Sequence, residues 1–95
     1  MSAWVYILAN RYRGTTYIGV TRDIARRTWQ HKTGTGSKFA RRYDAYRLVY
    51  VEQTELVVDA IAREKALKKW NRDWKIELIE QANPNWEDLF DRLNG

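Results

Sequence analysis

The sequence predicts an α+β domain in which a small, three-stranded, mostly antiparallel sheet is flanked by helices, in the order β-β-α-β-α-α-α. Residues 4–9 and 15–20 are rich in β-branched and aromatic residues, which favour strands. Residues 46–53, YRLVYVEQ, indicate a third strand, and most of the remaining segments carry apolar residues at helical spacing. A chain of 95 residues is expected to form one domain, residues 1–95.

The first two strands are expected to form a hairpin around the polar loop NRYRG. We predict a register in which the numbers of paired residues sum to 23, so that Tyr6 lies opposite Tyr17 and Trp4 opposite Gly19. Side chains alternate between the two faces of a strand, so both tyrosines would lie on the same face. Gly19 has no side chain and would leave space beside them.

Thr21 is the predicted N-cap of the next helix, which runs from Arg22 to about Lys32. Arg27 and His31 are four residues apart and therefore share a face of this helix. The inward-facing residues of the helix are expected to be Ile24, Ala25 and Thr28. The next segment, TGTGSKFARRY at 33–43, predicts a mobile basic loop. The cations of this loop that would contact phosphate are Lys38, Arg41 and Arg42.

Glu64 is an anomaly in the helix predicted from Leu56 to about Trp70. The inward positions of this helix are Val57, Ala60, Ile61, Glu64 and Leu67. A carboxylate therefore occurs where the helical period requires an apolar residue. An unpaired buried carboxylate is costly, which indicates either a functional group or a buried salt bridge to Arg or Lys.

Two more helices are predicted in the C-terminal part of the chain. One covers residues 72–81, and the other begins at Asn83 as the N-cap, with Pro84 in its first turn. The last helix would bury residues at helical spacing: Trp86, Leu89, Phe90 and Leu93. Trp29, Tyr43 and Tyr46 could stack on bases, but we expect them to pack in the core, as we expect of Trp70 and Trp74.

The charge balance favours a polyanionic partner such as nucleic acid, since 17 Lys and Arg face 12 Asp and Glu, a net charge of +5. The chain has no Cys, which excludes disulfides and thiolate metal sites. The apolar segment 3–9 is too short to span a bilayer and has no basic residues before it. We therefore expect a soluble, cytoplasmic protein without a membrane partner.

Two tripeptides and their spacing resemble the GIY-YIG nuclease superfamily. These are VYI at 5–7 and YIG at 17–19, followed by Arg27 and His31 on the next helix and by Glu64 after the third strand. The likeness covers most of the chain and is closest to a small single-domain group of uncharacterised bacterial GIY-YIG proteins. The first motif begins with Val5 rather than Gly, and we expect Val5 to point away from the tyrosine face.

The resemblance implies a catalytic role for four residues. Tyr17 corresponds to the tyrosine often proposed as the general base, and Tyr6 to the one that positions water or substrate. Arg27 matches the arginine that holds the scissile phosphate, for which its planar fork is suited. His31 falls where related enzymes often carry histidine, and a relay role or a hydrogen bond to a tyrosine suits it better than a metal.

The resemblance also implies one divalent metal ion, Mg²⁺ or Mn²⁺, with Glu64 as its protein carboxylate. Mg²⁺ is commonly bound by one or two carboxylates together with waters and phosphate oxygens. Family members have an asparagine near the metal, and Asn71 and Asn83 are both candidates for it. Gly19 would line the nucleic-acid side of the site.

The predicted function is metal-dependent hydrolysis of phosphodiester bonds in nucleic acid, DNA rather than RNA. Since 95 residues leave no room for an attached DNA-binding module, specificity would come from substrate shape, as in repair or recombination, or from a partner protein. Two alternatives stay open from the sequence. One is a nucleic-acid-binding module without turnover, and the other is a scaffold that docks on a repair protein.

Overall fold

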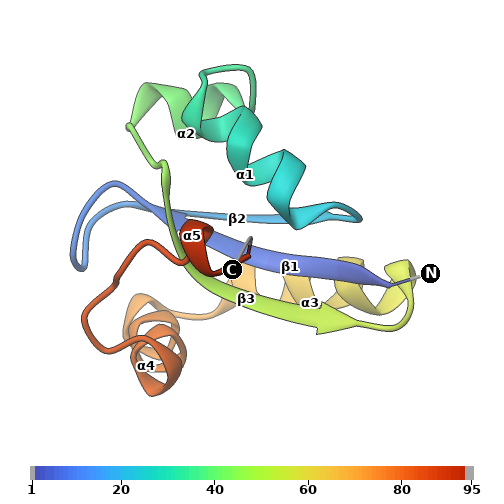
Figure 1. Ribbon diagram of the computed structural model, residues 1–95. Coiled ribbons are helices and arrows are strands. Elements are labelled where there is room, and N and C mark those ends of the chain that lie inside the picture. The colour runs from blue at the N-terminus through green and yellow to red at the C-terminus, as the bar shows by residue number, and fades with distance from the viewer. Residues whose placement is uncertain (1, 94–95) are drawn as a thin grey trace.

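A computed structural model describes residues 2–93 and contains one three-stranded sheet, in agreement with the predicted α+β class. The strands are β1 (Ala3–Ala9), β2 (Thr16–Thr21) and β3 (Arg47–Thr54). They are ordered β2-β1-β3 and both pairings are antiparallel, as Figure 1 shows. The helices are α1 (Ile24–Lys32), α2 (Lys38–Arg42), α3 (Val57–Lys69), α4 (Arg72–Ala82) and α5 (Phe90–Leu93).

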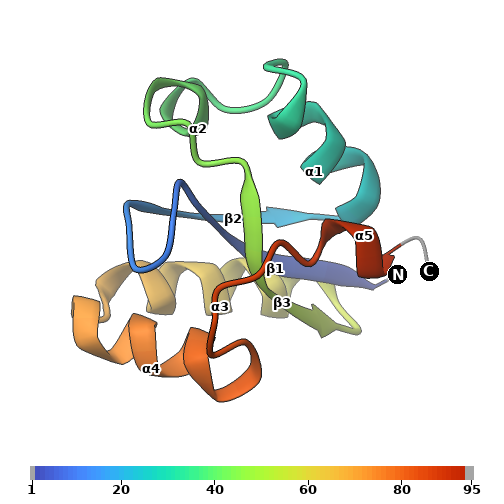
Figure 2. The same cartoon turned by 60° about the vertical axis from the view of Figure 1, so that its left-hand side comes forward.

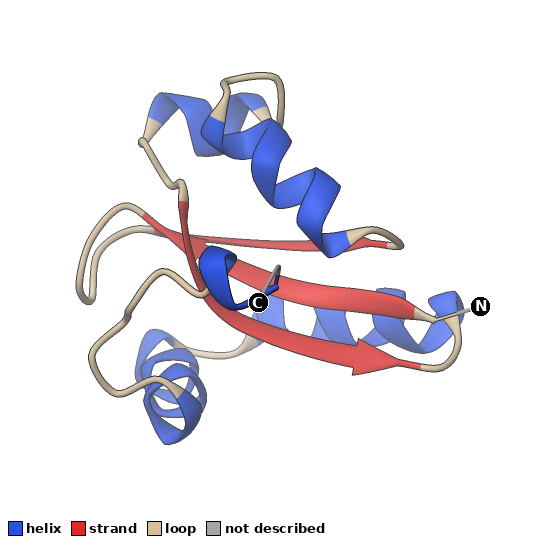
Figure 3. Ribbon diagram, in the orientation of Figure 1, coloured by secondary structure: helices blue, strands red, loops and turns tan. Residues whose placement is uncertain are grey.

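The sheet separates two layers of helices (Figures 1 and 2). Helices α1, α2 and α5 lie on one face, and α3 and α4 lie on the other; Figure 3 shows the red strands between these blue helices. Each face has its own hydrophobic core, because side chains alternate along the strands. Val5, Ile7 and Ile18 pack toward α3 and α4, whereas Tyr6 and Leu8 pack toward α1 and α2. Among residues 2–93, the helices are all too short or too polar to cross a bilayer.

The predicted register of the hairpin is wrong by two residues. Tyr6 lies opposite Gly19, and Tyr17 lies opposite Leu8, so that paired numbers sum to 25. The cause is Asn10, whose side-chain Oδ1 accepts from the Thr15 amide at 2.9 Å while its own amide donates to the Thr15 carbonyl at 3.2 Å. A two-residue shift preserves the alternation of faces, so both tyrosines still lie on one face.

The segment between α1 and β3 is not the simple loop that was predicted. Asp23, rather than Thr21, caps α1, since its Oδ1 accepts from the Arg26 amide at 3.1 Å. Residues Lys38–Arg42 form the short helix α2. Ser37 is its N-cap, and its hydroxyl oxygen accepts from the Phe39 backbone amide at 3.1 Å. Burial of Ala40 fixes this helix against the core on the α1 face of the sheet.

The C-terminal segment also differs from the prediction. Residues 84–89 are not helical, and Trp86 is buried in a left-handed conformation with φ of 55°. The Leu89 amide donates to the Leu48 carbonyl at 2.8 Å, and the Leu48 amide donates to Asp88 at 3.2 Å, so this segment runs along β3. Only α5 is helical there.

Several residues predicted to be buried are exposed instead. They are Trp29 and Trp74, exposed by 57% and 56%, and Ile61 and Tyr43, exposed by 41% and 39%. Their periodicity is real, but in a chain this small each helix has only one neighbouring layer to cover it.

Candidate active site

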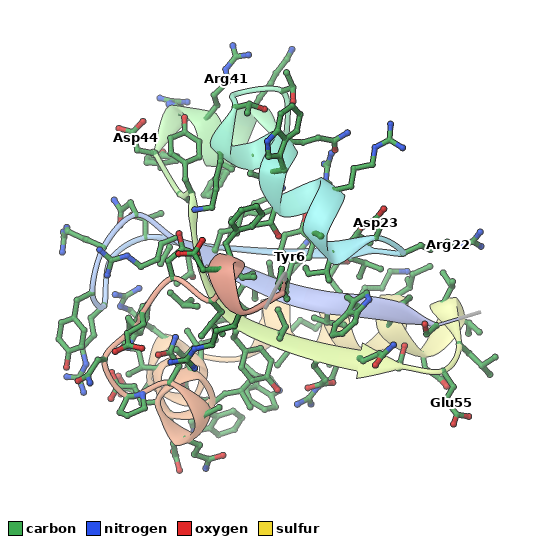
Figure 4. The ribbon with its side chains drawn as sticks, viewed as in Figure 1. Tyr6, Arg22, Asp23, Arg41, Asp44 and Glu55 are labelled. Atoms are coloured by element: carbon green, nitrogen blue, oxygen red, sulfur yellow. The ribbon has the colours of Figure 1, made fainter. Side chains whose placement is uncertain are left out.

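Tyr6 on β1 and Tyr17 on β2 are diagonal neighbours on the face that carries α1. Their ring centroids are 6.3 Å apart with the planes inclined at 45°. Tyr6 is buried, with 1% of its surface exposed, whereas Tyr17 is half-buried. Figure 4 shows Tyr6 between β1 and α1. The two phenols therefore share one site but differ in their access to solvent.

Gly19 allows the Tyr6 ring to lie across β2. A Cβ at position 19 would be 2.4 Å from both Cζ and Oη of Tyr6, a distance that atoms cannot adopt without a shift. The residue opposite Tyr6 in the ladder must therefore be glycine if the ring is to keep this position. Gly19 therefore leaves room for the Tyr6 phenol, as the sequence predicted. Its role in lining the nucleic-acid side of the site stays a prediction.

His31 on α1 completes the aromatic cluster. Its Nε2 lies 3.1 Å from the Tyr6 hydroxyl oxygen, and its ring centroid is 5.8 Å from Tyr6 and 5.6 Å from Tyr17. The hydrogen bond to a tyrosine that the sequence favoured is therefore present. Burial, helped by the charge of Arg27, lowers the pKa of His31 to about 4, so the imidazole is neutral at pH 7.

The other ring nitrogen of His31 is buried against Gly36. Within residues 2–93, Nδ1 of His31 has no hydrogen-bond partner. A Cβ at position 36 would lie 2.4 Å from this nitrogen, so Gly36 packs directly on the imidazole. The ring is held by packing on one side and by the Tyr6 hydroxyl on the other.

Arg27 on α1 supplies the positive charge of the site. Its pKa is raised above the ordinary value, chiefly by interaction with the Tyr6 hydroxyl and further by Tyr17, while burial opposes the rise, so the guanidinium is always charged. Its Nη1 also donates to Gln30 Oε1 at 3.1 Å. Burial raises the pKa of Tyr6 to about 12 even though Arg27 opposes the rise, so Tyr6 stays protonated.

Glu64 lies on α3, in the helical layer on the other side of the sheet. Helix α3 packs beneath β1 and β2, and the Glu64 charge is one of the influences that raise the pKa of Tyr6. Its side chain is 20% exposed and pairs with Lys68, one turn further along α3, at 3.5 Å.

The Glu64 carboxylate can serve as the protein ligand of one divalent cation. Within the described residues, 2–93, no three His, Asp or Glu side chains form a ready cage for a metal. Glu64 is a partly buried carboxylate whose partner is a single lysine at 3.5 Å, on a side chain that is itself 52% exposed. Such a carboxylate suits Mg²⁺, which retains waters and takes further oxygens from phosphate.

The side chains of the two candidate asparagines both make hydrogen bonds to the backbone. Asn71 caps α4, with its Oδ1 accepting from the Trp74 amide at 2.9 Å. Asn83 is 4% exposed. Its side-chain Nδ2 donates to the backbone carbonyls of Val49 and Glu87 at 3.0 and 2.9 Å, and its Oδ1 accepts from the Glu87 backbone amide at 3.0 Å. Both asparagines therefore have structural roles in the fold, and a role of either near the metal stays a prediction.

The predicted phosphate-binding cations lie on α2 and are exposed. Arg42 lies over the Tyr43 ring at 5.6 Å, and Arg41 donates to the Gly34 carbonyl at 3.2 Å. Figure 4 shows Arg41 at the outer end of the α1–α2 layer, away from Tyr6. Lys38, in the first turn of α2, is exposed as well.

A hollow of about 280 Å³ beside Tyr17 adds residues that the sequence did not indicate. Its lining comes from β2, α2, α3 and α4: Thr16, Tyr17, Ile18, Phe39, Lys68 and Lys75. Phe39 was missed because its segment was predicted as a loop. Lys68 could have been found, since it follows the anomalous Glu64 at helical spacing of four.

Comparison with known proteins gives one consistent result. The model of the GIY-YIG catalytic domain family matches residues 2–77. A UPF0213 protein of Staphylococcus saprophyticus is 31% identical over 79 residues, which cover 83% of this chain and 95% of that protein. A UPF0213 protein of Clostridium perfringens is 32% identical over 91 residues, covering 96% and 97%. The solution NMR structure of a UPF0213 protein from Bacillus halodurans covers 93% of both chains, with 31% identity and a TM-score of 0.57.

Proposed function

Because the chain belongs to the GIY-YIG family, we propose that it is an endonuclease that hydrolyses phosphodiester bonds in nucleic acid, DNA rather than RNA, with one divalent metal ion. The observation that carries the proposal is the cluster of two phenols, an imidazole and a guanidinium on the α1 face of the sheet. Hydrolysis needs an activated water, a held phosphate and neutralisation of the developing charge.

Tyr17, in its phenolate form, would accept the proton of the attacking water and become the neutral phenol. It is half-buried and lines the 280 Å³ hollow, so water and substrate reach it. Tyr6 is buried and its pKa is raised to about 12, which makes it a hydrogen-bonding group rather than a base. His31, neutral at pH 7, holds the Tyr6 hydroxyl at 3.1 Å. The protonation states of the buried pair therefore leave the base role to Tyr17.

Arg27 holds the scissile phosphate. A guanidinium whose pKa is raised further remains charged at every working pH and donates paired, charge-assisted hydrogen bonds to phosphate oxygens. Glu64 would hold the metal ion. When bound, a divalent ion acidifies water and neutralises charge on the phosphate. Lys68 would then exchange its ion pair with Glu64 for the solvent or for a phosphate of the substrate.

Cleavage of labelled DNA tests this proposal. We expect the wild type to cut single-stranded or flap DNA with Mg²⁺ or Mn²⁺, and expect Tyr17→Phe to lower the rate by about 10²–10⁴-fold, the range for loss of a general base. Glu64→Gln should remove the response to metal while the variant still binds the oligonucleotide.

Matched controls come from the same residue types outside the site. Tyr12, in the hairpin loop, is 50% exposed, and Glu55 lies at the distant turn between β3 and α3 (Figure 4). Tyr12→Phe and Glu55→Gln should cut as the wild type does. Cutting that survives both site substitutions would contradict the proposal. A wild type that binds DNA but never cuts it would instead be a nucleic-acid-binding module.

A further inference from the structure

The hollow beside Tyr17 is built from both layers of the fold. Phe39 enters it from α2 above the sheet, whereas Lys68 and Lys75 enter it from α3 and α4 below. Its volume of about 280 Å³ lies near the lower end, about 300 Å³, of the range for small-molecule sites. A hollow of this size accommodates one nucleotide unit and is too small for a stacked base pair.

A row of aromatic rings leads out of the hollow along α2. Tyr17 and Phe39 have ring centroids 5.8 Å apart with planes inclined at 30°, and Phe39 and Tyr43 have centroids 4.8 Å apart. Phe39 and Tyr43 are 43% and 39% exposed, so part of each ring is open to solvent. Hydrogen bonds at Ser37 and Tyr43 cap both ends of the α2 backbone, from which the two rings project. Partly exposed rings beside a candidate base form a platform for stacking.

Cations flank this row on both sides. The Arg42 guanidinium lies 5.6 Å over the Tyr43 ring, at the outer end of the row. Lys68 and Lys75 lie at its inner end, across the hollow from Phe39. Aromatic faces for stacking together with cations for phosphate are the two features by which proteins bind single-stranded nucleic acid.

On the basis of the nuclease function proposed above, we propose that the hollow and the row of rings bind an unpaired nucleotide next to the scissile phosphate. The base stacks on Phe39 and Tyr43, and Lys68 and Lys75 neutralise the flanking phosphates. A base within an intact duplex is covered by its neighbours and cannot present its face to Phe39. The platform therefore selects DNA that has an unpaired nucleotide, such as a flap, a gap or a single strand.

Binding measured without metal tests this selection. In EDTA, the anisotropy of a fluorescein-labelled single strand and of the matching duplex reports affinity without hydrolysis. We expect Phe39→Ala to weaken binding of the single strand by about 5- to 150-fold, the loss for one stacked base, and to leave binding of the duplex unchanged. Phe39→Tyr should bind as the wild type does. Equal affinity of Phe39→Ala and the wild type for the single strand would overturn the proposal.

Trp29→Ala is the matched control for loss of an exposed aromatic ring. Trp29 is 57% exposed on α1, and it does not line the hollow. Its replacement should leave binding of the single strand unchanged. A loss as large as that of Phe39→Ala would mean a general surface effect and would overturn the proposal.

An abasic nucleotide tests the contact without altering the protein. When the abasic position is moved along the strand, one position should weaken binding to the wild type by about 5- to 150-fold and have no effect on Phe39→Ala. Equal losses for both proteins at every position would overturn the proposal, even if Phe39→Ala were partly unfolded.

The two proposals fail in different ways. A wild type that shows the Phe39-dependent binding in EDTA but does not cut DNA with Mg²⁺ or Mn²⁺ contradicts the nuclease function and supports the platform. A wild type that cuts single strands and duplexes equally well, with Phe39→Ala cutting both at the same rates, supports the nuclease function and overturns the platform.

Discussion

The Tyr6 hydroxyl oxygen lies 3.1 Å from Nε2 of His31, and both side chains have only 1% of their surface exposed. This buried hydrogen bond joins β1 to α1 and holds the phenol beside Arg27. A charged imidazole cannot be accommodated there, since burial and Arg27 lower its pKa to about 4. The stability of the fold should therefore depend on pH through this one histidine.

We expect the free energy of unfolding to fall as the pH is lowered from about 6.5 to about 4. Between these values the unfolded chain binds a proton at His31, whose ordinary pKa is 6.5, while the folded chain does not. Stability therefore rises with pH in this window, by up to about 1.4 kcal/mol per pH unit. Urea denaturation at a series of pH values measures the slope.

His31→Gln is the control for this slope, because glutamine keeps a hydrogen-bonding group and does not titrate. Carboxylates contribute to acid denaturation in both proteins, so the difference between them isolates the histidine. A variant with the same slope as the wild type between pH 6.5 and 5 would contradict the assignment of a neutral, buried His31.

Gly19→Ala should disturb the site more than its size suggests. The new Cβ would lie 2.4 Å from Cζ and Oη of Tyr6, so the ring must move out of its position over β2. We expect a loss of about 1–3 kcal/mol in stability, the usual cost of overpacking, together with a loss of DNA cleavage. Thermal denaturation and the cleavage rate of the same sample check both.

A second substitution separates this clash from a general weakening of the strand. Tyr6→Leu removes the atoms that the new Cβ meets, so Gly19→Ala should cost less in the Tyr6→Leu background than in the wild type. Equal costs in the two backgrounds would show that contact with Tyr6 is not the reason for glycine at position 19.

The sequence predicts the tyrosine pair correctly and its register wrongly, for physical reasons. The pairing of the two tyrosines on one face survives the error in register, because a shift of two residues keeps each side chain on its face. The shift itself is set by the Asn10 side chain and its bond to the Thr15 amide, which is one of several ways to close such a loop. The family resemblance therefore predicts which residues form the site, whereas local hydrogen bonds determine the register in which the strands pair.

Short elements were the least predictable part of the fold. Helix α2 has five residues and is fixed by the burial of Ala40 and the cap at Ser37, which depend on tertiary packing. The spacing of Trp86 and Leu89 suggested a helix, but Leu89 instead pairs with Leu48 along β3. The stacking row on α2 could not be inferred before that helix was known.

The two asparagines give a direct check on the limits of the resemblance. We expect Asn83→Ala to lower stability by about 2–4 kcal/mol, because three hydrogen bonds to the backbone of Val49 and Glu87 are lost in a buried place. Asn71→Ala should cost about 1 kcal/mol, as for loss of an N-cap. Thermal denaturation measures both. Neither substitution should change the rate of DNA cleavage at a temperature where the variant is folded. A large loss of rate in a variant of unchanged stability would show that this asparagine acts at the site.

The cations of α2 should differ in their contribution to DNA binding, and the salt dependence of the affinity can rank them. Each phosphate contact that is lost should reduce the slope of log K against log salt by about 0.9 on a duplex and about 0.7 on a single strand. We expect this reduction for Lys38→Ala and Arg42→Ala. Arg41→Ala should leave the slope unchanged, because its guanidinium donates to the Gly34 carbonyl at 3.2 Å and lies at the outer end of the layer. Equal slopes for all three variants and the wild type would mean that phosphate binds elsewhere, with Lys68 and Lys75 as the remaining candidates at the hollow.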